Sequence, residues 1–456
     1  MTSPTRSKLA PPTGSIPKLD YPTAQEHTLP NGLTVAVIED HRSPIISFRF
    51  GCRNGRTTNP SNNLGILQIA MDLIFEGTGR YDSKELAREF DQLAIQTETD
   101  VFLESLRLAV STLSPHLERA VELIAEVILD AHFDEVELEK LKTRWGSLLI
   151  AERAQPAFLA AERTMQALFP GHPYSHISFP LDHLKSMERN HIREVFKSRF
   201  VPEQTILLFS GPITLDKASK LAEKFLGNWN PSETTVTEPL LKNPPDSQIY
   251  LVHRPGSVQT HFEVARRGPR RGDPDFLLLN LTNQIFGGGA SSRLFLNLRE
   301  DKGYTYGAYS LVHGYRQGGF LSAAADVRSD VITDALHQTI LEMDRIQSQE
   351  VTQGEIEMAR NEMVGKLIRR METVSGTAAL ELVRQLNDLP IDYYQQYIPC
   401  LHQMGSQQIL ECARTHFDTS KIVTTVVGDA ESILKGLEQF GEVLLYNDQG
   451  TPLEGL

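Results

Sequence analysis

Arg299 and Tyr306 stand seven residues apart in the segment SSRLFLNLREDKGYTYGAYS, residues 291–310. A planar guanidinium and a phenolic hydroxyl are donors that hold a peptide carbonyl or stabilise an oxyanion. We expect an amphipathic helix capped by Gly303 to carry Arg299, and a strand from Tyr304 onward to carry Tyr306. The two side chains would then converge across the glycine corner. The alternative is structural: Arg299 pairs with a nearby carboxylate, and Tyr306 is a half-buried sheet residue.

The same segment resembles one in the C-terminal half of the pitrilysin family of zinc peptidases, which includes mitochondrial processing peptidase. In that family a helix ending in Leu-Arg-Glu is followed by a glycine and then by the tyrosine. The residues that match are Leu298-Arg299-Glu300, Gly303 and Tyr306. The resemblance extends from about Tyr21 to about Leu445. It implies that Arg299 and Tyr306 bind the substrate carbonyl.

The pitrilysin family carries its zinc on an inverted H-x-x-E-H helix in the first domain, where the glutamate is the general base. Residues 65–78, GILQIAMDLIFEGT, match the frame of that helix without a gap. Gln68, Met71 and Asp72 occupy the positions of the first histidine, the base and the second histidine. The resemblance also places Leu148 at a further glutamate ligand. An amide is a poor zinc ligand, methionine accepts no proton from water, and leucine has no ligand atom, so we expect no metal or other cofactor in this chain.

The chain therefore keeps the substrate half of a composite active site and lacks the metal half. The resemblance implies a non-catalytic subunit of a two-subunit zinc peptidase, with no activity of its own. A homologous partner subunit bearing H-x-x-E-H would supply the zinc, and Arg299 and Tyr306 would act in trans on a peptide or unfolded polypeptide. Two alternatives remain: a structural or assembly subunit, like the core subunits of the respiratory bc1 complex, and a homodimeric peptide-binding module.

The elements that must position these residues follow an α+β pattern with signs of duplication. Residues 74–79, IFEGTG, correspond to residues 285–290, IFGGGA, and the apolar strand and helix from Thr205 recur at a similar offset from Ile422. Duplication predicts two homologous domains, each a largely antiparallel sheet with covering helices. We expect a flexible N-terminal arm over 1–24, a first domain over 25–227, a linker over 228–247 and a second domain over 248–456.

Within the first domain, the dipeptide Asn31-Gly32 predicts a hairpin between strands at 26–29 and 33–38. Apolar periodicity predicts one long helix over 134–169 and another over 180–200.

Composition excludes several classes of protein. At 456 residues, with 40% hydrophobic and 23% charged residues, the chain resembles a globular protein of two domains. Its net charge of -13 argues against nucleic-acid binding. Cys52, Cys400 and Cys412 form no C-x-x-C pair, which argues against a thiolate metal site. No apolar run predicts a secretory signal or membrane insertion, so we expect a cytoplasmic location, or a periplasmic one if the chain is a processed form.

Overall fold

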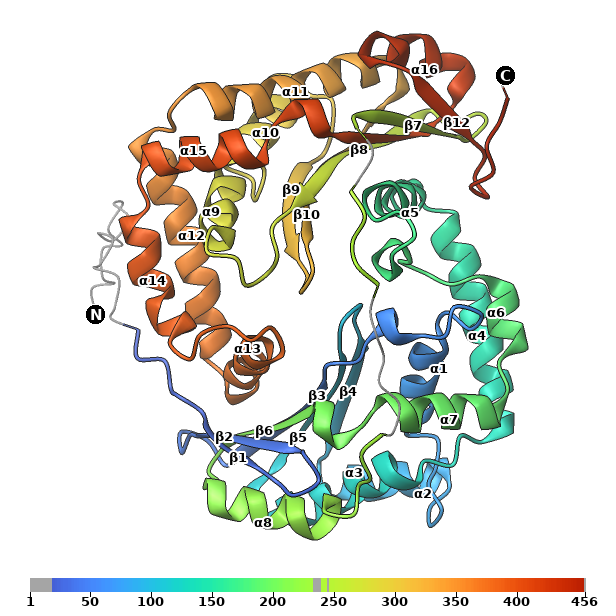
Figure 1. Cartoon of the computed structure of the whole chain (residues 1–456), viewed down its shortest axis with the longest axis vertical. Helices are drawn as coiled ribbons and strands as arrows, with labels where there is room; N and C mark the ends of the chain where they lie inside the picture. Colours follow the sequence, from blue (N-terminus) through green and yellow to red (C-terminus); the bar gives the residue numbers. More distant parts are fainter. Residues whose placement is uncertain (1–18, 233–238, 244–245, 455–456) are drawn as a thin grey trace, which may run out of the picture.

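A computed structural model of the chain describes residues 19–232, 239–243 and 246–454. Two halves lie opposite one another, and in each a sheet carries its own helices on the outside (Figure 1). Residues 1–18 of the predicted arm and residues 233–238 and 244–245 of the predicted linker lie outside the described residues. No helix in the described ranges is long and apolar enough to cross a membrane.

The first sheet has the strand order β1-β2-β6-β3-β5-β4. Its strands are β1 (Gln25–Thr28), β2 (Thr34–Glu39), β3 (Ile45–Cys52), β4 (Gln96–Val101), β5 (Leu106–Leu113) and β6 (Thr205–Gly211). The helices of this half are α1 (Ile66–Leu73), α2 (Ser83–Gln92), α3 (Leu117–Asp130), α4 (Glu135–Arg153), α5 (Pro156–Leu168), α6 (Leu181–Ser186), α7 (Arg189–Arg199) and α8 (Leu215–Leu226).

The second sheet repeats this order as β12-β7-β11-β8-β10-β9. Its strands are β7 (Gln248–His253), β8 (Gln259–Gly268), β9 (Ala308–Gly314), β10 (Gly319–Arg328), β11 (Val423–Gly428) and β12 (Val443–Tyr446). The helices are α9 (Phe276–Phe286), α10 (Arg293–Phe295), α11 (Ile332–Ser348), α12 (Gln353–Met371), α13 (Val374–Leu386), α14 (Tyr393–Gln403), α15 (Ser406–His416) and α16 (Ala430–Leu437). The predicted pair of homologous, largely antiparallel α+β units is confirmed.

The two sheets differ at one outer edge. β1 pairs with β2 antiparallel, in the predicted hairpin, whereas β12 pairs with β7 parallel. Asn31 fixes the hairpin turn because its amide donates to the carbonyls of Leu226 and Trp229 at 2.8 and 3.2 Å. Gly32 follows with φ of +90°, a conformation that favours glycine. The edge strands thus come from opposite ends of their respective halves.

Two predicted long helices are each divided in the structure. The helix expected over 134–169 is wrong as one element, because α4 ends at Arg153 and α5 begins at Pro156. Proline lacks the amide hydrogen that a continuous helix needs, and it is favoured in the first turn of a new one. The helix expected over 180–200 divides likewise into α6 and α7, separated by an extended Met187-Glu188 pair.

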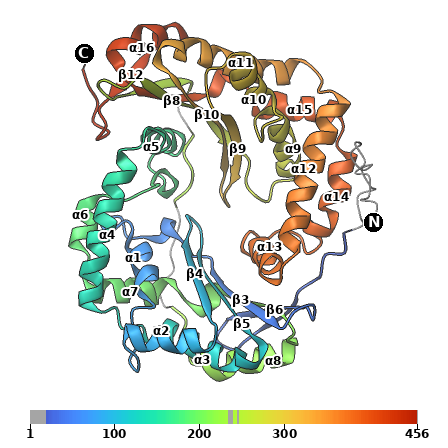
Figure 2. The same cartoon turned by 180° about the vertical axis from the view of Figure 1, so that it is seen from behind.

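Each half lends one helix to the sheet of the other half. α13, from the second half, lies on β3 and β6 of the first sheet, and α5, from the first half, lies on β11 and β8 of the second (Figures 1 and 2). Leu382 and Leu386 of α13 form an apolar cluster with Ile206 and Leu208 of β6. Leu159 of α5 belongs to a matching cluster on the second sheet. Part of the inner face of each sheet is therefore buried by a helix that lies far away in the sequence.

The described start of the chain joins this exchange. Tyr21 is buried in the apolar core of the second half, and its ring centroid lies 5.0 Å from that of Tyr394. The Tyr21 hydroxyl donates to Glu381 on α13 at 3.4 Å. The segment that leads into the first sheet is thus anchored on the opposite half.

We predict that Leu382→Ala destabilises the first half although Leu382 belongs to the second. Leu382 lies against Gly51, where an added Cβ would stand only 2.6 Å from its side chain, so truncation leaves a cavity on β3. Loss of a buried leucine side chain costs about 2–5 kcal/mol. Urea unfolding would measure this loss, and hydrogen exchange should accelerate in β3 and β6. Leu341→Ala, at a 39% exposed position on α11, is the control and should change stability by about 0.5 kcal/mol or less.

Candidate functional site

Gln68, Met71 and Asp72 lie on α1, close to the wall of the first half. Gly65 precedes this helix with φ of +85°, and a Cβ there would stand 2.3 Å from the Phe179 ring, so only glycine fits. Gln68 and Asp72 lie one helical turn apart on the same, partly exposed face. Met71, between them in sequence, is fully buried. The frame of the helix therefore survives without the side chains that hold zinc.

The carboxylate of Asp72 is engaged within the chain. The Trp145 indole Nε1 on α4 donates to Asp72 Oδ2 at 2.7 Å, and Gln68 Nε2 donates to Oδ1 at 3.2 Å. Arg144 adds a guanidinium 3.8 Å from Oδ2. Both carboxylate oxygens thus accept hydrogen bonds from neighbouring side chains. The Asp72 carboxylate would have to give up the indole hydrogen bond to bind a metal.

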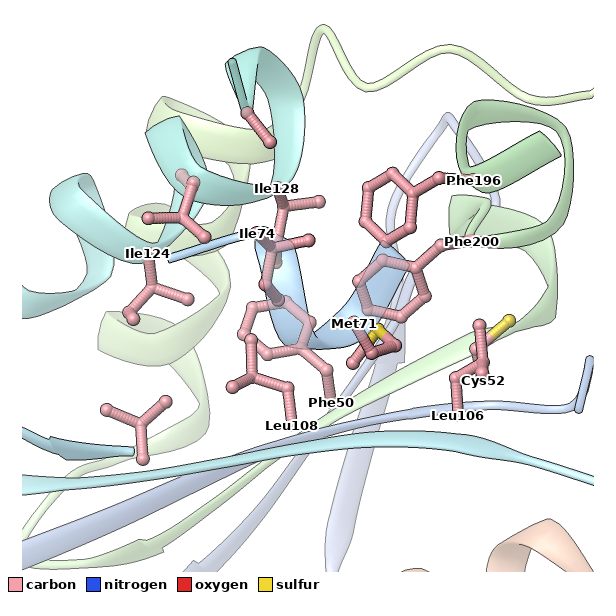
Figure 3. Packing of buried hydrophobic residues seen from close by; sticks show 14 of the residues in the cluster. Phe50, Cys52, Met71, Ile74, Leu106, Leu108, Ile124, Ile128, Phe196 and Phe200 are labelled. Atoms are coloured by element: carbon pink, nitrogen blue, oxygen red, sulfur yellow. The ribbon is translucent and has the colours of Figure 1, made fainter. Parts of the chain in front are cut away.

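Met71 lies in the apolar core. Its side chain has no exposed surface, and Figure 3 shows it among Phe50, Phe200, Leu106 and Cys52. A general base must reach a water molecule at the metal. The side chain at this position instead packs under the sheet, where a carboxylate would lose its hydration.

Leu148 supplies no ligand, and its side chain is 45% exposed on α4. Gln68 and Trp145 line a small cavity of about 90 Å³ with Glu152 and His176. Burial and the neighbouring His183 lower the pKa of His176. The described residues contain no group of three or more His, Cys, Asp or Glu side chains that could hold a metal ion. The residues present at this position therefore do not fit zinc.

Arg299 lies in a π-helix, Leu296–Asp301, that continues α10. The predicted single α-helix is wrong in this last part, where the wider turn is of a kind often found at functional sites. Gly303 ends it with φ of +65°, as expected of a glycine cap. The Arg299 guanidinium stacks 4.8 Å from the Phe295 ring centroid, and its Nε lies 3.5 Å from Glu300. The side chain remains 45% exposed, with donors that can reach a ligand.

An ion pair anchors the N-terminal end of the helical segment that carries Arg299. Arg293 donates to both carboxylate oxygens of Glu355, on α12, at 2.6 and 3.2 Å. Burial opposes ionisation of Glu355, but hydrogen bonds from Arg293 and Thr352 prevail and lower its pKa to about 2. The pair therefore stays ionised at neutral pH and fixes the direction of the segment that carries Arg299.

Tyr306 does not lie in a strand, because β9 begins only at Ala308. The expected strand from Tyr304 is wrong: Tyr304 turns aside to donate to Asp334 at 2.8 Å, and the chain from Lys302 to Gly307 is a connection. Tyr306 is 93% exposed, and no group in the described residues hydrogen-bonds its hydroxyl. The half-buried alternative is also wrong. That Arg299 and Tyr306 converge on one point stays a prediction.

Tyr306 borders an open cavity of about 500 Å³ on the inner face of the second sheet. Glu263 of β8 lies in its wall, and burial raises the pKa of this carboxyl group. His261 and Asp326 face each other in register across β8 and β10, with Nδ1 and Oδ1 3.0 Å apart. Our sequence reasoning missed these residues. The available signal was that the polar side chains of His261 and Glu263 alternate with Phe262 and Val264 in the strand.

The sequence matches two family models, and the descriptions of both name peptidase family M16. Residues 34–162 match "Insulinase (Peptidase family M16)", and residues 186–363 match "Peptidase M16 inactive domain". The first match contains the altered zinc frame, and the second contains Arg299 and Tyr306.

Similar curated proteins include peptidases and a non-peptidase. An uncharacterized zinc protease YmxG of Bacillus subtilis is 24% identical, covering 77% of this chain and 85% of that protein. A "non-peptidase homolog YmxG" of Helicobacter pylori is 20% identical, covering 89% and 95%. A probable mitochondrial-processing peptidase subunit beta of Arabidopsis thaliana is 19% identical, covering 81% and 71%.

Two solved structures share the fold. A peptidase M16 inactive domain from Pseudomonas fluorescens superposes with a TM-score of 0.84 at 21% identity, covering 89% of this chain and 98% of that one. A protease from Helicobacter pylori gives a TM-score of 0.83 at 18% identity, covering 89% and 99%.

We predict that Met71→Glu destabilises the fold severely, because it places a carboxylate among aromatic rings. Burial of even an uncharged polar group without partners costs roughly 2–7 kcal/mol, and an ionised carboxylate costs more. Met71→Leu is the matched control and should cost less than about 1.5 kcal/mol. Urea unfolding followed by circular dichroism would compare the two. Equal stability of both variants would show that α1 can turn the position toward solvent.

We also predict that the purified chain holds no stoichiometric zinc, because Asp72 is the only carboxylate on α1 and it is already hydrogen-bonded. Metal analysis after gel filtration in zinc-containing buffer is the measurement. About one zinc per chain, lost in Asp72→Ala, would contradict this expectation.

Proposed function

The chain belongs to the M16 family of peptidases, and on that premise we propose that it is a zinc-free subunit of a two-subunit M16 peptidase. In this proposal a homologous partner subunit bearing H-x-x-E-H supplies the zinc and the general base. Arg299 and Tyr306 of this chain bind the peptide substrate and stabilise the oxyanion that forms at its carbonyl. The observation that carries the proposal is the exposed Tyr306 hydroxyl beside an open cavity, in a chain whose Asp72 carboxylate is hydrogen-bonded to Trp145.

The contacts of the zinc-frame residues, and those of Arg299 and Tyr306, support this proposal. Both carboxylate oxygens of Asp72 accept hydrogen bonds from within the chain, and Met71 is buried in the core. This part of the chain therefore offers a water molecule neither a metal site nor a general base. In contrast, Tyr306 is 93% exposed, and Arg299 lies near Glu300 but is still 45% exposed. Donors that are exposed in this way remain available to a ligand.

The surroundings of Tyr306 favour an extended peptide. β9 is an edge strand of the second sheet, and Tyr309 and Leu311 project from it into the wall of the cavity. An edge strand offers backbone groups that pair with an added peptide strand. A peptide lying along β9 would pass the Tyr306 hydroxyl at the point where the strand begins.

We predict that Tyr306→Phe lowers kcat in the reconstituted two-subunit enzyme with little change in KM. The substitution removes only the hydroxyl, and loss of one donor to an oxyanion typically costs about 10²-fold or more, or roughly 3 kcal/mol. Tyr304→Phe is the matched control, because the Tyr304 hydroxyl is used internally on Asp334. Peptide cleavage would be measured with a zinc-bearing M16 homologue as partner.

Arg299→Lys tests the second donor, because it keeps the charge and loses the planar fork. Arg328→Lys, at an exposed arginine paired with Asp330, is its control. If both site variants assemble normally and cleave at the parental rate, Arg299 and Tyr306 do not act on the substrate. A chain that forms no complex with a zinc-bearing homologue, and instead dimerises with itself, would favour the peptide-binding module.

A further inference from the structure

Two hairpins, one from each half, meet at their tips in the centre of the molecule. The β4–β5 and β9–β10 hairpins extend toward each other in Figures 1 and 2. The carboxylate of Glu104, in the first hairpin, accepts the backbone N–H of Arg316, in the second, at 2.9 and 3.0 Å. Leu103 and Tyr315 pack in one apolar cluster beside it. This contact joins the two halves through residues that belong to neither of the exchanged helices, α5 and α13.

A cavity of about 390 Å³ opens beside this contact, and both halves form its walls. Its size lies within the range of small-molecule sites. Three arginines line it: Arg56 and Arg107 come from the first half, and Arg271 comes from the second. Phe102 and Phe276 supply apolar walls, one from each half. The cavity thus combines cations with aromatic surface.

None of the three guanidinium groups forms an ion pair within the described residues, although Asp100 and Glu152 act on Arg107 and Arg56 from farther away. In the part of the chain that the structure describes, no carboxylate lies within 4.0 Å of Arg56, Arg107 or Arg271. Glu104 also lines the cavity, but its carboxylate is occupied by the backbone N–H of Arg316. This local excess of positive charge stands in a chain of net charge -13.

The geometry of the arginines leaves donors available. The Arg107 guanidinium carbon lies 4.2 Å from the Phe102 ring centroid, and that of Arg271 lies 4.6 Å from the Phe276 ring centroid. Stacking occupies the face of a guanidinium and leaves its in-plane N–H groups free to bind an oxyanion. One of these groups on Arg107 donates to Ser105 Oγ at 3.2 Å, which helps to fix its orientation.

The electrostatic cost of this arrangement also indicates an anionic occupant. Burial lowers the pKa of Arg107 and of Arg56, since a desolvated cation is less stable. Arg56 Nε is buried without a hydrogen-bond partner in the described residues. Desolvation and the charge of Arg271 lower the pKa of His313, which shares the cavity. An oxyanion would offset the desolvation and repulsion together.

We propose that this cavity binds an organic carboxylate, with the carboxylate between the arginines and an apolar body against Phe102 and Phe276. The carboxylate belongs either to a free acid or to the C-terminal residue of a peptide. A ligand there contacts both hairpins and holds the two halves together at their tips. The site is separate from Arg299 and Tyr306, which do not line this cavity, and it is independent of their role.

The first experiment is calorimetric titration of the full chain with N-acetylphenylalanine and, as the matched neutral probe, N-acetylphenylalaninamide. We expect the acid to bind and the amide to bind roughly tenfold more weakly or not at all, because hydrogen bonds to charged groups are the stronger ones. Hydrogen exchange at residues 102–105 and 312–315 should slow when the acid is bound. Equal binding of acid and amide, or no binding of the acid, would overturn the proposal.

Variants locate the site. Arg107→Gln and Arg271→Gln should each weaken binding of the acid about tenfold or more, and Arg107→Lys should be intermediate. Arg270→Gln is the matched control, because Arg270 adjoins Arg271 in sequence but pairs with Asp273. Thermal unfolding without ligand checks that each variant folds. Unchanged binding in both Gln variants, or an equal loss in Arg270→Gln, would place the anion elsewhere.

Peptides distinguish the two sources of the carboxylate. A short peptide ending in phenylalanine is compared with its C-terminally amidated form and with N-acetylphenylalanine. Tighter binding of the free-acid peptide than of N-acetylphenylalanine supports a peptide terminus as the ligand, and weaker binding supports a free acid. If the amidated peptide binds as well as the free-acid form, the carboxylate is not what the cavity recognises, and the proposal fails.

Discussion

The exchange of α5 and α13 between the halves is the constraint on which the rest of the structure depends. Every residue of β6 and of β11 is buried, because these central strands have their own helices on one face and a borrowed helix on the other. Strands covered on both faces read as nearly continuous apolar runs, which both of these do. Neither sheet can therefore bury its inner face with residues of its own half. The two halves are bound by core packing rather than by a surface contact.

The same exchange decides where ligands can reach the sheets. α13 covers β3 and β6 and leaves β5 and β4 open, while α5 covers β11 and β8 and leaves β10 and β9 open. The polar side chains of the inner faces gather on these uncovered hairpins: Arg107 stands on β5, and Asp326 stands on β10. The cavity beside Tyr306 and the arginine-lined cavity are thus consequences of which strands the borrowed helices leave uncovered.

Local patterns in the sequence were sufficient for the hairpin at Asn31-Gly32 and the altered zinc frame, because each depends on neighbouring residues. The duplication was predicted from two pairs of matching segments, but the strand order was not. The end of the Arg299 helix at Gly303 was also predictable from the positive φ that glycine favours. The start of β9 was not, because Tyr304 leaves the strand direction to reach Asp334 on α11. Trp145, Glu263 and the three arginines depend on contacts between segments distant in the chain, which one sequence does not reveal.

The order of synthesis gives the exchanged helices a further consequence. The first sheet is complete once β6 has been made, at Gly211, but its apolar inner face waits for α13, which begins at Val374. At about 5–20 residues per second, the ribosome needs roughly ten to thirty seconds to make the intervening chain. During that interval the nascent first half exposes Ile206 and Leu208 to other nascent chains. Transiently exposed apolar surface favours aggregation, so the interval between synthesis of β6 and synthesis of α13 is the stage at which this fold is most vulnerable to it.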